Sequence, residues 1–171
     1  MKRMGQLFLE DYRHMKKLQK LRDRCAKVSI LKFYFNYLIE LKRRKFVKTY
    51  GCEVSPGATI GNCYFLHPIG LVIGRDAIIE DGVIIMSGIT FGSLKADGAI
   101  GKQHVKTGTL IGTGAKILGD LTIGENCVIG ANSVVTKDVP NNSLVVGYNI
   151  IKEKKNKEYI KLDVFEDAYA K

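Results

Sequence analysis

Residues 105–140 read VKTGTLIGTGAKILGDLTIGENCVIGANSVVTKDVP, and an aliphatic residue returns there at every sixth position. The aliphatic series is Val105, Ile111, Ile117, Ile123, Ile129 and Val135. Four positions further along each hexad stands a residue that is mostly small, namely Thr109, Ala115, Leu121, Cys127, Ser133 and Val139. Neither an α-helix nor an extended strand has a period of six, so the chain must turn a corner in every hexad. Hexapeptide repeats predict a parallel β-helix, an all-β solenoid in which each hexad supplies one short strand and one corner.

The same rhythm extends towards the N-terminus. It recurs at Val54, Ile60 and Leu66 and, after one extra residue, at Ile73, Ile79, Ile85 and Phe91. We therefore expect a solenoid over residues 54–140, with about four coils of three hexads each. The register is lost over residues 92–104, which predicts a protruding loop, and insertions of this kind are often functional. A β-sandwich would explain a period of two but not a period of six.

The composition fits one folded domain with a smaller appendage. The chain has 171 residues, of which 46% are hydrophobic, so it is not a disordered protein. It has no run of eighteen apolar residues and no apolar segment behind its basic N-terminus, and we expect a cytoplasmic protein. Without a CxxC pair or a metal-like spacing, the cysteines are expected to be reduced, mostly buried and free of metal; they are Cys25, Cys52, Cys63 and Cys127.

Positive charge is concentrated at the N-terminus. Residues 1–50 hold 15 of the 27 Lys and Arg against four acids, a net charge of +11, and residues 51–171 carry −1. We expect one helix over residues 7–27 and a second one capped by Ser29, with one face formed by Ile30, Phe33, Tyr34, Tyr37, Leu38 and Leu41.

Two partners for this apolar face stay open. It can cover the open end of the solenoid, whose strand edges need a partner, or it can lie on a membrane surface while residues 42–45 (KRRK) meet anionic headgroups. No recognition motif supports nucleic-acid binding. The chain thus divides into a basic helical segment (1–50), a solenoid domain (51–150) and a tail (151–171) that forms a short helix or frays.

The three histidines are candidates for chemistry because so few are present. His14 lies in the first predicted helix, as a solvated residue. His67 follows the inward Leu66 at a position where glycine is common in the repeat, and His104 ends the predicted loop. Either His67 and His104 form a catalytic pair or they are two ordinary surface histidines. A neutral imidazole suits the removal of a hydroxyl proton near neutral pH.

Several stretches, in one order, resemble the hexapeptide-repeat acyltransferases, and within them the serine acetyltransferase branch. They are residues 53–61 (EVSPGATIG), 66–74 (LHPIGLVIG), 87–92 (SGITFG), 111–119 (IGTGAKILG) and 129–135 (IGANSVV). The resemblance covers roughly residues 51–155. It implies a left-handed parallel β-helix, an exception to the usual right-handed crossover, and a homotrimer with acetyl-CoA as co-substrate in the groove between subunits.

The resemblance also implies roles for particular residues. His67 matches the general base, His104 the second active-site histidine, and Glu53 the carboxylate that orients the base. The positions implied for acetyl-CoA binding are Gly92, Thr113, Ala115, Ser133 and Lys137. The implied mechanism is direct transfer, in which His67 deprotonates the acceptor hydroxyl and the oxygen attacks the thioester. No cysteine nucleophile is needed.

Two departures bear on the acceptor. The branch places an Asp before the base and an Arg before the second histidine to hold serine, and here those positions are Leu66 and Gln103. Because charge-assisted hydrogen bonds contribute about 1.5–3 kcal/mol each, a zwitterion would bind weakly without them. We therefore expect a neutral hydroxyl, such as a sugar of a surface polysaccharide precursor, acetylated in the cytoplasm or at the inner membrane face. Serine is the alternative acceptor, and a non-catalytic scaffold is the remote alternative.

Overall fold

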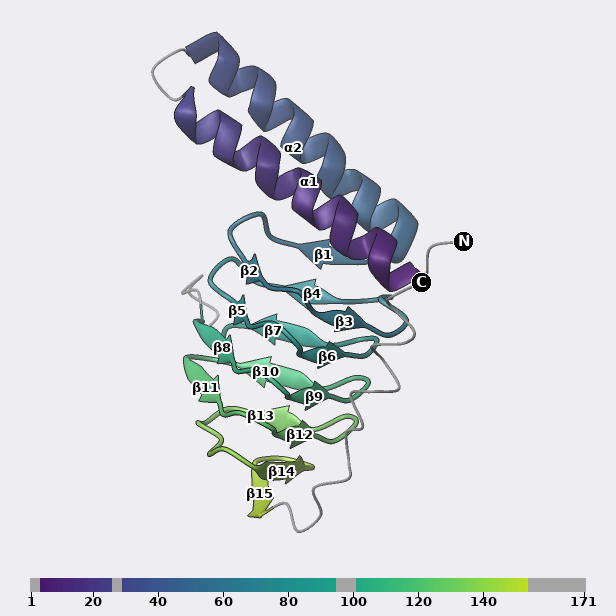
Figure 1. The fold of residues 1–171 in the computed structure, drawn as a ribbon, viewed down its shortest axis with the longest axis vertical. Coiled ribbons are helices and arrows are strands. Elements are labelled where there is room, and N and C mark those ends of the chain that lie inside the picture. The colour runs from purple at the N-terminus through teal and green to yellow at the C-terminus, as the bar shows by residue number, and fades with distance from the viewer. Residues whose placement is uncertain (1–3, 26–28, 95–100, 154–171) are drawn as a thin grey trace.

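The computed structural model describes residues 4–25, 29–94 and 101–153, which form a helical hairpin followed by a solenoid of short strands (Figure 1). The hairpin consists of α1 (Met4–Arg24) and α2 (Ser29–Tyr50). Sheet A contains β1 (Glu53–Val54), β4 (Val72–Ile73), β7 (Thr90–Gly92), β10 (Lys116–Leu118) and β13 (Val134–Val135). Sheet B contains β2 (Thr59–Ile60), β5 (Ile78–Ile79), β8 (Gln103–Val105) and β11 (Leu121–Ile123). Sheet C contains β3 (Tyr64–Phe65), β6 (Ile84–Ile85), β9 (Leu110–Ile111), β12 (Val128–Ile129), β14 (Ser143–Val146) and β15 (Ile150–Glu153).

The sheets confirm the solenoid predicted from the hexads. From β1 to β13 consecutive strands visit sheets A, B and C in turn, and each strand pairs in parallel with its equivalent in the next coil, as Ile73 does with Phe91 and Phe91 with Ile117. The five strands of sheet A mark about five turns, one more than the series predicted. The prediction fell short because β14 continues parallel to β12 beyond Pro140. The antiparallel strand β15 then closes sheet C, where the sequence had suggested a helix or frayed chain.

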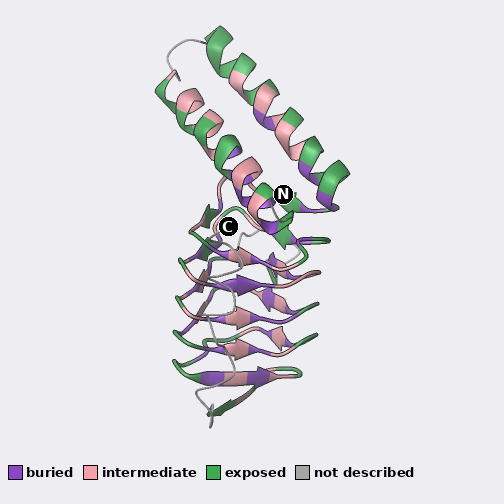
Figure 2. Cartoon of the chain, turned by 45° about the vertical axis from the view of Figure 1, so that its right-hand side comes forward, coloured by how far each residue is buried: buried purple, intermediate pink, exposed green. Residues whose placement is uncertain are grey.

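Most of the predicted inward residues form the core, but the prediction for Leu66 was wrong. Phe65 before it is buried and pairs with Ile85, whereas Leu66 is half-buried, because the register of β3 is shifted by one residue. Ile73, Phe91, Ile117 and Val135 stack on one another along sheet A, and each is at most 2% exposed. The residues four positions later in the hexads, from Thr109 to Val139, are also buried. In Figure 2 the solenoid strands are mainly buried or intermediate, whereas exposed residues lie at the corners. Stacking identical positions of successive coils thus gives one continuous apolar core.

The corners require a left-handed backbone. Between sheets C and A this conformation recurs in successive coils at Gly70, Gly88, Gly114 and Asn132, with φ from 55° to 77°. Glycine has no Cβ to clash there, and asparagine tolerates the conformation better than most residues. The recurring glycines of the hexads are therefore explained by the geometry of the turns.

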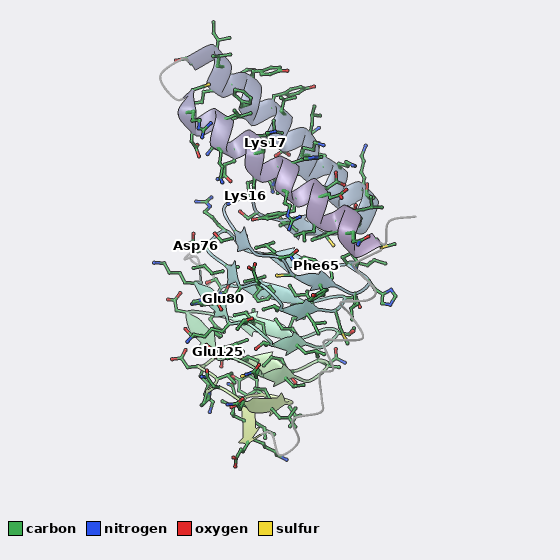
Figure 3. All side chains as sticks on the ribbon, in the orientation of Figure 1. Lys16, Lys17, Phe65, Asp76, Glu80 and Glu125 are labelled. Atoms are coloured by element: carbon green, nitrogen blue, oxygen red, sulfur yellow. The ribbon has the colours of Figure 1, made fainter. Side chains whose placement is uncertain are left out.

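The hairpin covers the N-terminal end of the solenoid. Phe8 of α1 packs its ring against Phe65 of β3 at a centroid distance of 4.6 Å, and Tyr12 and Met15 are buried beside it. Figure 3 shows Phe65 in the solenoid below the helices, with Lys16 and Lys17 along α1. The Lys16 Nζ donates to the carbonyl oxygens of Pro56 and Ala58 at 3.0 and 2.8 Å. The open end is thus covered mainly by α1.

The apolar face predicted for the second helix does not cover the solenoid. Ile30, Phe33, Tyr34, Tyr37 and Leu41 of α2 are all exposed, and α2 instead buries Ile39, Phe46 and Tyr50. The prediction failed because α2 has apolar residues on two sides. Neither helix, over its described residues, is long and apolar enough to cross a membrane.

Candidate active site

His67 stands at an exposed corner between β3 and β4, where the chain passes from sheet C to sheet A. Its φ is 52°, in the left-handed region that glycine favours. Leu66 before it is half-buried and Pro68 after it is buried, so the corner is anchored on both sides. No hydrogen bond joins the imidazole to another described residue. A non-glycine residue held in this conformation is a reasonable mark of a functional position.

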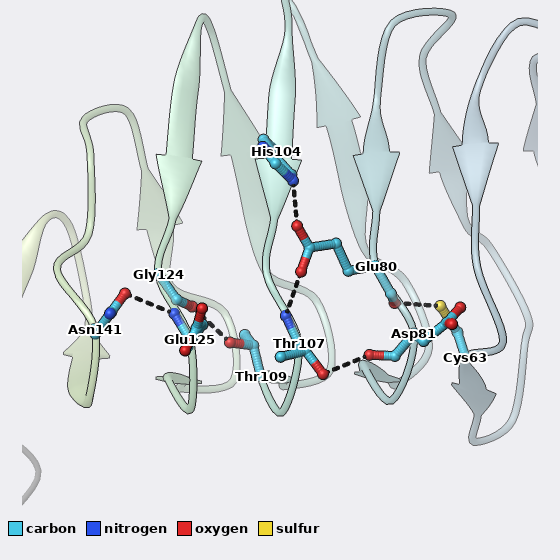
Figure 4. A network of polar contacts seen from close by, with 9 residues as sticks. All are labelled: Cys63, Glu80, Asp81, His104, Thr107, Thr109, Gly124, Glu125 and Asn141. Atoms are coloured by element: carbon cyan, nitrogen blue, oxygen red, sulfur yellow. Dashed lines mark hydrogen bonds and ion pairs between the residues drawn. The ribbon is translucent and has the colours of Figure 1, made fainter.

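His104 is in a strand, not at the end of a loop as the sequence suggested. It lies in β8 of sheet B, and its Nε2 is 2.7 Å from the Oε1 of Glu80, while the other carboxylate oxygen accepts a hydrogen bond from the Thr107 amide (Figure 4). The predicted loop therefore ends before Gln103, and residues 95–100 of it lie outside the described residues.

The structure does not bring the two histidines together within one chain. Each coil is a triangle whose sides belong to sheets A, B and C, so the corner between C and A lies opposite the side formed by B. His67 occupies that corner and His104 that opposite side. A site that uses both rings requires a second copy of the chain.

Glu53, expected to orient His67, has a different partner in the structure. It begins β1 with a side chain that is 64% exposed, and its Oε1 lies 3.4 Å from the Nη2 of Arg43 in α2. Arg43 also contacts Glu40, Nη1 to Oε2, at 3.1 Å. No hydrogen bond joins Glu53 to His67 among the described residues. Salt bridges this exposed are weak, so Arg43 does not fix the Glu53 carboxylate firmly.

The carboxylate of Glu53 faces a large cleft between the hairpin and the first coils. The cleft has a volume of about 950 Å³ and is lined by α1, α2 and the sheet A side of the solenoid. Its lining includes carboxylates and guanidinium groups of Arg22, Glu40, Arg43, Glu53 and Arg75. Side chains of both signs therefore line the same cleft, which also reaches Gly92.

Gln103 is not placed to contact an acceptor. Its side chain is buried, and its Nε2 donates to the carbonyl oxygens of Gly92 at 2.9 Å and Gly119 at 2.6 Å. The Gln103 side chain thus connects the end of β7, which precedes the insertion, with the following coil. The uncharged Gln103 therefore gives no structural reason to expect a neutral acceptor in place of serine. Leu66 remains an apolar neighbour of His67.

The positions implied for acetyl-CoA border sheet A. Thr113 is exposed at the corner that precedes β10, whereas Gly92 ends β7 and Lys137 follows β13 at the opposite edge. The side chains of Ala115 and Ser133 are fully buried, so only their backbone could meet a ligand. The outer face of sheet A therefore lies between the positions implied for acetyl-CoA.

The cysteines take no part in this site. All four are free, and Cys52, Cys63 and Cys127 are buried, as predicted. Burial and, to a smaller extent, the neighbouring Asp81 charge raise the pKa of the Cys63 thiol from 9.0 to about 12. A protonated thiol is a poor nucleophile, which fits direct transfer without an acyl-cysteine.

Sequence reasoning missed Glu80, Arg43 and Arg75. Glu80 could have been found from the hexads, since Ile79 and Val105 are equivalent inward positions and their outward neighbours therefore share a face. Arg43 had no such signal, because it reaches Glu53 only through the packing of the hairpin on the solenoid.

A parallel solenoid of hexads with a left-handed corner histidine has the architecture of hexapeptide-repeat transferases, and the chain belongs to that family. The family model described as bacterial transferase hexapeptide (six repeats) matches residues 104–137. Within the family, the similar curated proteins are serine acetyltransferases. That of Bacillus subtilis is 46% identical over 120 residues, 68% of this chain and 53% of the relative, and that of Mycobacterium tuberculosis is 46% identical over 100 residues, 57% and 43%.

Solved serine acetyltransferases have a similar fold. The structure from Vibrio cholerae matches with a TM-score of 0.71 and 30% identity, over 86% of this chain and 53% of that one. The structure from Brucella abortus in complex with coenzyme A matches with a TM-score of 0.70 and 30% identity, over 84% and 53%. The chain spans about half the length of the curated relatives it matches.

Proposed function

We propose that the protein transfers an acetyl group from acetyl-CoA to the hydroxyl of L-serine. The observation that carries this proposal is the 46% identity to a serine acetyltransferase over 68% of the chain. The aligned part of the chain is so long that it must include both His67 and His104, wherever it begins within the 171 residues. The comparisons therefore favour serine, the alternative of the sequence analysis, over the sugar acceptor expected there.

His67 acts as the general base in this reaction. Its imidazole takes the proton of the serine hydroxyl while the oxygen attacks the thioester carbonyl of acetyl-CoA. The new C–O bond forms, the C–S bond breaks, and the imidazolium returns the proton to the leaving CoA thiolate. O-acetylserine and CoA are the products. The ring of His67 is exposed and has no hydrogen bond to another residue that the structure describes, which supports this role because the ring is accessible to both substrates.

His104 enters the reaction from a neighbouring copy. Since His67 and His104 lie on opposite parts of the triangular coil, a trimer that places the corner of one copy against sheet B of the next would bring them together. Glu80 then holds the His104 ring in a fixed orientation through the 2.7 Å contact. This arrangement accounts for both histidines, which a single chain does not.

Neither His67 nor His104 lines the cleft beside Glu53 within one chain, so for this cleft to supply the charges that serine requires, the contact between copies must bring it to the histidines. Carboxylates of Glu40 and Glu53 suit the ammonium group, and the Arg75 guanidinium, which has no ion pair with the described residues, suits the carboxylate. Leu66 and Gln103 then need not carry charge. A zwitterion is thus accommodated by groups other than those that the resemblance implied.

Kinetics with purified full-length chain test the acceptor. Release of the CoA thiol is measured with L-serine, with a hexose and without acceptor. We expect L-serine to give the higher kcat/KM, and Arg75→Met to raise the KM for L-serine by about tenfold, as loss of one charge-assisted hydrogen bond predicts. Lys152→Met, on the exposed strand β15, is the matched control.

A neutral hydroxyl acceptor is the second candidate, favoured by Leu66 beside the base. If a hexose is acetylated at least about tenfold more efficiently than L-serine, a difference of about 1.4 kcal/mol, the serine proposal is wrong and this candidate replaces it. If acetyl-CoA does not bind in calorimetry, both are wrong and the chain is a scaffold.

A further inference from the structure

One long face of α2 points away from the rest of the molecule. The buried residues Ile39, Phe46 and Tyr50 mark the side of the helix that packs. At 100° per residue, the opposite side carries seven residues, here called the outer stripe: Ile30, Phe33, Tyr34, Tyr37, Leu41, Arg44 and Lys48. Most of α2 is exposed in Figure 2.

The outer stripe begins apolar and ends basic. The exposed fractions of Ile30, Phe33, Tyr34, Tyr37 and Leu41 are 81%, 76%, 53%, 58% and 43%. Beyond them, towards the solenoid, the exposed Arg44 and Lys48 occupy the same side of the helix. Contiguous exposed apolar side chains of this size mark an interaction surface rather than an ordinary solvated face.

The positive charge of α2 is not compensated within the helix. The helix has six basic residues and one acidic residue, Glu40, a net charge of +5. Glu40 already pairs with Arg43 and Arg44, and Lys45 pairs with Asp11 of α1. Lys48 has no ion pair among the described residues. The ligand of the stripe must therefore combine an apolar layer with negative charge.

We propose that the outer stripe docks on the surface of an anionic lipid bilayer. Phenylalanine and tyrosine rings favour the boundary between headgroups and acyl chains, and Arg44 and Lys48 then lie at the depth of the lipid phosphates. This proposal does not depend on the proposed function. It changes the basic cluster suggested by the sequence, residues 42–45, because Arg43 and Lys45 pair away from the stripe with Glu53 and Asp11, whereas Arg44, also paired with Glu40, lies on the stripe.

A second copy of the chain fits the stripe less well. Two stripes packed in parallel would bring Arg44 and Lys48 against the same cations of the partner. Packed antiparallel, they would place those cations over aromatic rings, which attract a cation weakly but do not neutralise its charge. Since the stripe contains no carboxylate, neither arrangement neutralises it, and like charges at an interface are unfavourable.

The place of the hairpin in the molecule leaves the stripe accessible. α1 and α2 project beyond β1, at the end of the solenoid, while sheets A, B and C line its length (Figure 1). Copies that assemble through the sheets would therefore leave the outer stripe uncovered.

Co-sedimentation of the full chain with vesicles tests the proposal. Vesicles of phosphatidylcholine alone are compared with vesicles that also contain phosphatidylglycerol, at low and high salt. We expect binding to the anionic vesicles that weakens with salt. We expect Arg44→Glu with Lys48→Glu to lower the partition coefficient at least about tenfold, because two attractive charges near the lipid surface become repulsive. We expect Phe33→Ser with Tyr37→Ser to lower it at least about tenfold as well, because the apolar area that enters the bilayer is lost.

Matched controls separate the stripe from net charge and from hydrophobicity. Lys17→Glu with Lys20→Glu changes the charge equally on exposed positions of α1, and Tyr148→Ser with Ile150→Ser removes exposed apolar side chains at the other end of the molecule. Both controls should keep binding, and circular dichroism should show all variants folded.

Three results would overturn the proposal. One is the absence of binding to anionic vesicles. Another is equal loss of binding in the control variants. The third is light scattering in which the stripe variants dissociate an assembly of the wild type, which would mean that a second copy covers the stripe.

Discussion

His67 combines an unusual backbone with an unengaged side chain. A left-handed conformation costs most residues about 1–2 kcal/mol, and this corner has it twice, at His67 and at Gly70, the position that glycine or asparagine fills in the neighbouring coils. The fold therefore tolerates a strained residue at a place where glycine would suit the backbone better. Such strain usually remains where the side chain has a use.

Replacing His67 by asparagine should remove the base and keep the corner. Asparagine already occupies this conformation at Asn126, Asn132 and Asn142. We expect His67→Asn to lower kcat by about two to four orders of magnitude, the usual contribution of general base catalysis, with unchanged acetyl-CoA affinity and thermal stability. His14→Asn, on the exposed side of α1, should have no effect. Wild-type turnover in His67→Asn would exclude this residue as the base.

Cys63 gives the protein a definite response to alkaline pH. The folded protein holds its thiol pKa at about 12 because the side chain is buried, whereas the unfolded chain has the ordinary value of 9.0. Below pH 9 both states carry the proton. Between pH 9 and 12 only the unfolded state loses it, so the stability contributed by this group falls as the pH rises.

The difference in unfolding free energy between wild type and Cys63→Ala isolates this effect. It should be constant below about pH 8 and should decrease above pH 9 by up to about 1.4 kcal/mol per pH unit. Chemical denaturation at a series of pH values measures it. A difference that does not depend on pH up to 11 would contradict the raised pKa.

At the scale of elements, the insertion between β7 and β8 is held at its base. Gln103 begins β8 and donates to Gly92 at the end of β7 and to Gly119 in the following coil. Because these carbonyl groups lie beside a buried amide, their hydrogen bonds cannot be replaced by water without rearrangement. The side chain therefore connects elements and does not select the acceptor.

Gln103→Leu should accordingly change stability and not acceptor binding. Loss of the buried hydrogen bonds is expected to lower the free energy of unfolding by about 1–3 kcal/mol, with an unchanged KM for L-serine. Thr107→Val, which removes an exposed hydrogen bond to the Asp81 carbonyl, should cost less than about 0.5 kcal/mol. A raised KM with unchanged stability would instead show that residue 103 contacts the acceptor.

The solenoid presents long faces to solvent. His67 and His104 lie on different parts of this surface. Outward side chains on sheet A and sheet B include Val72 and Ile78, exposed to 39% and 42%. If the reaction needs both His67 and His104, the unit that works is an assembly. The resemblance implies a trimer, which would place one site at each contact between copies.

Light scattering should therefore give three times the chain mass, and mixed variants should complement each other. His67→Asn and His104→Asn are each expected to be nearly inactive alone. After unfolding and refolding together, random assortment should restore about a quarter of the wild-type activity, because that share of contacts combines an intact His67 with an intact His104. A monomer, or no recovery on mixing, would remove the shared site.

The sequence by itself determined the repeating parts of this protein. Ile73, Phe91 and Ile117 are inward because successive coils stack equivalent positions, and three hexads of the sequence make one coil in space. The corner at His67 could be placed only to within one residue, because Phe65 and not Leu66 is the inward residue before it. The number of coils was underestimated only where Pro140 suggested an end.

Only the tertiary structure decided where the repeat resumes after an irregular segment and how the elements pack on one another. The length of chain in the insertion does not reveal where β8 begins, so the burial of Gln103 could not be foreseen. The partners of α2 were equally hidden, because a helix with apolar residues on two sides can pack through either. Packing of α1 on Phe65 settled that choice, leaving Ile30 and Tyr37 exposed.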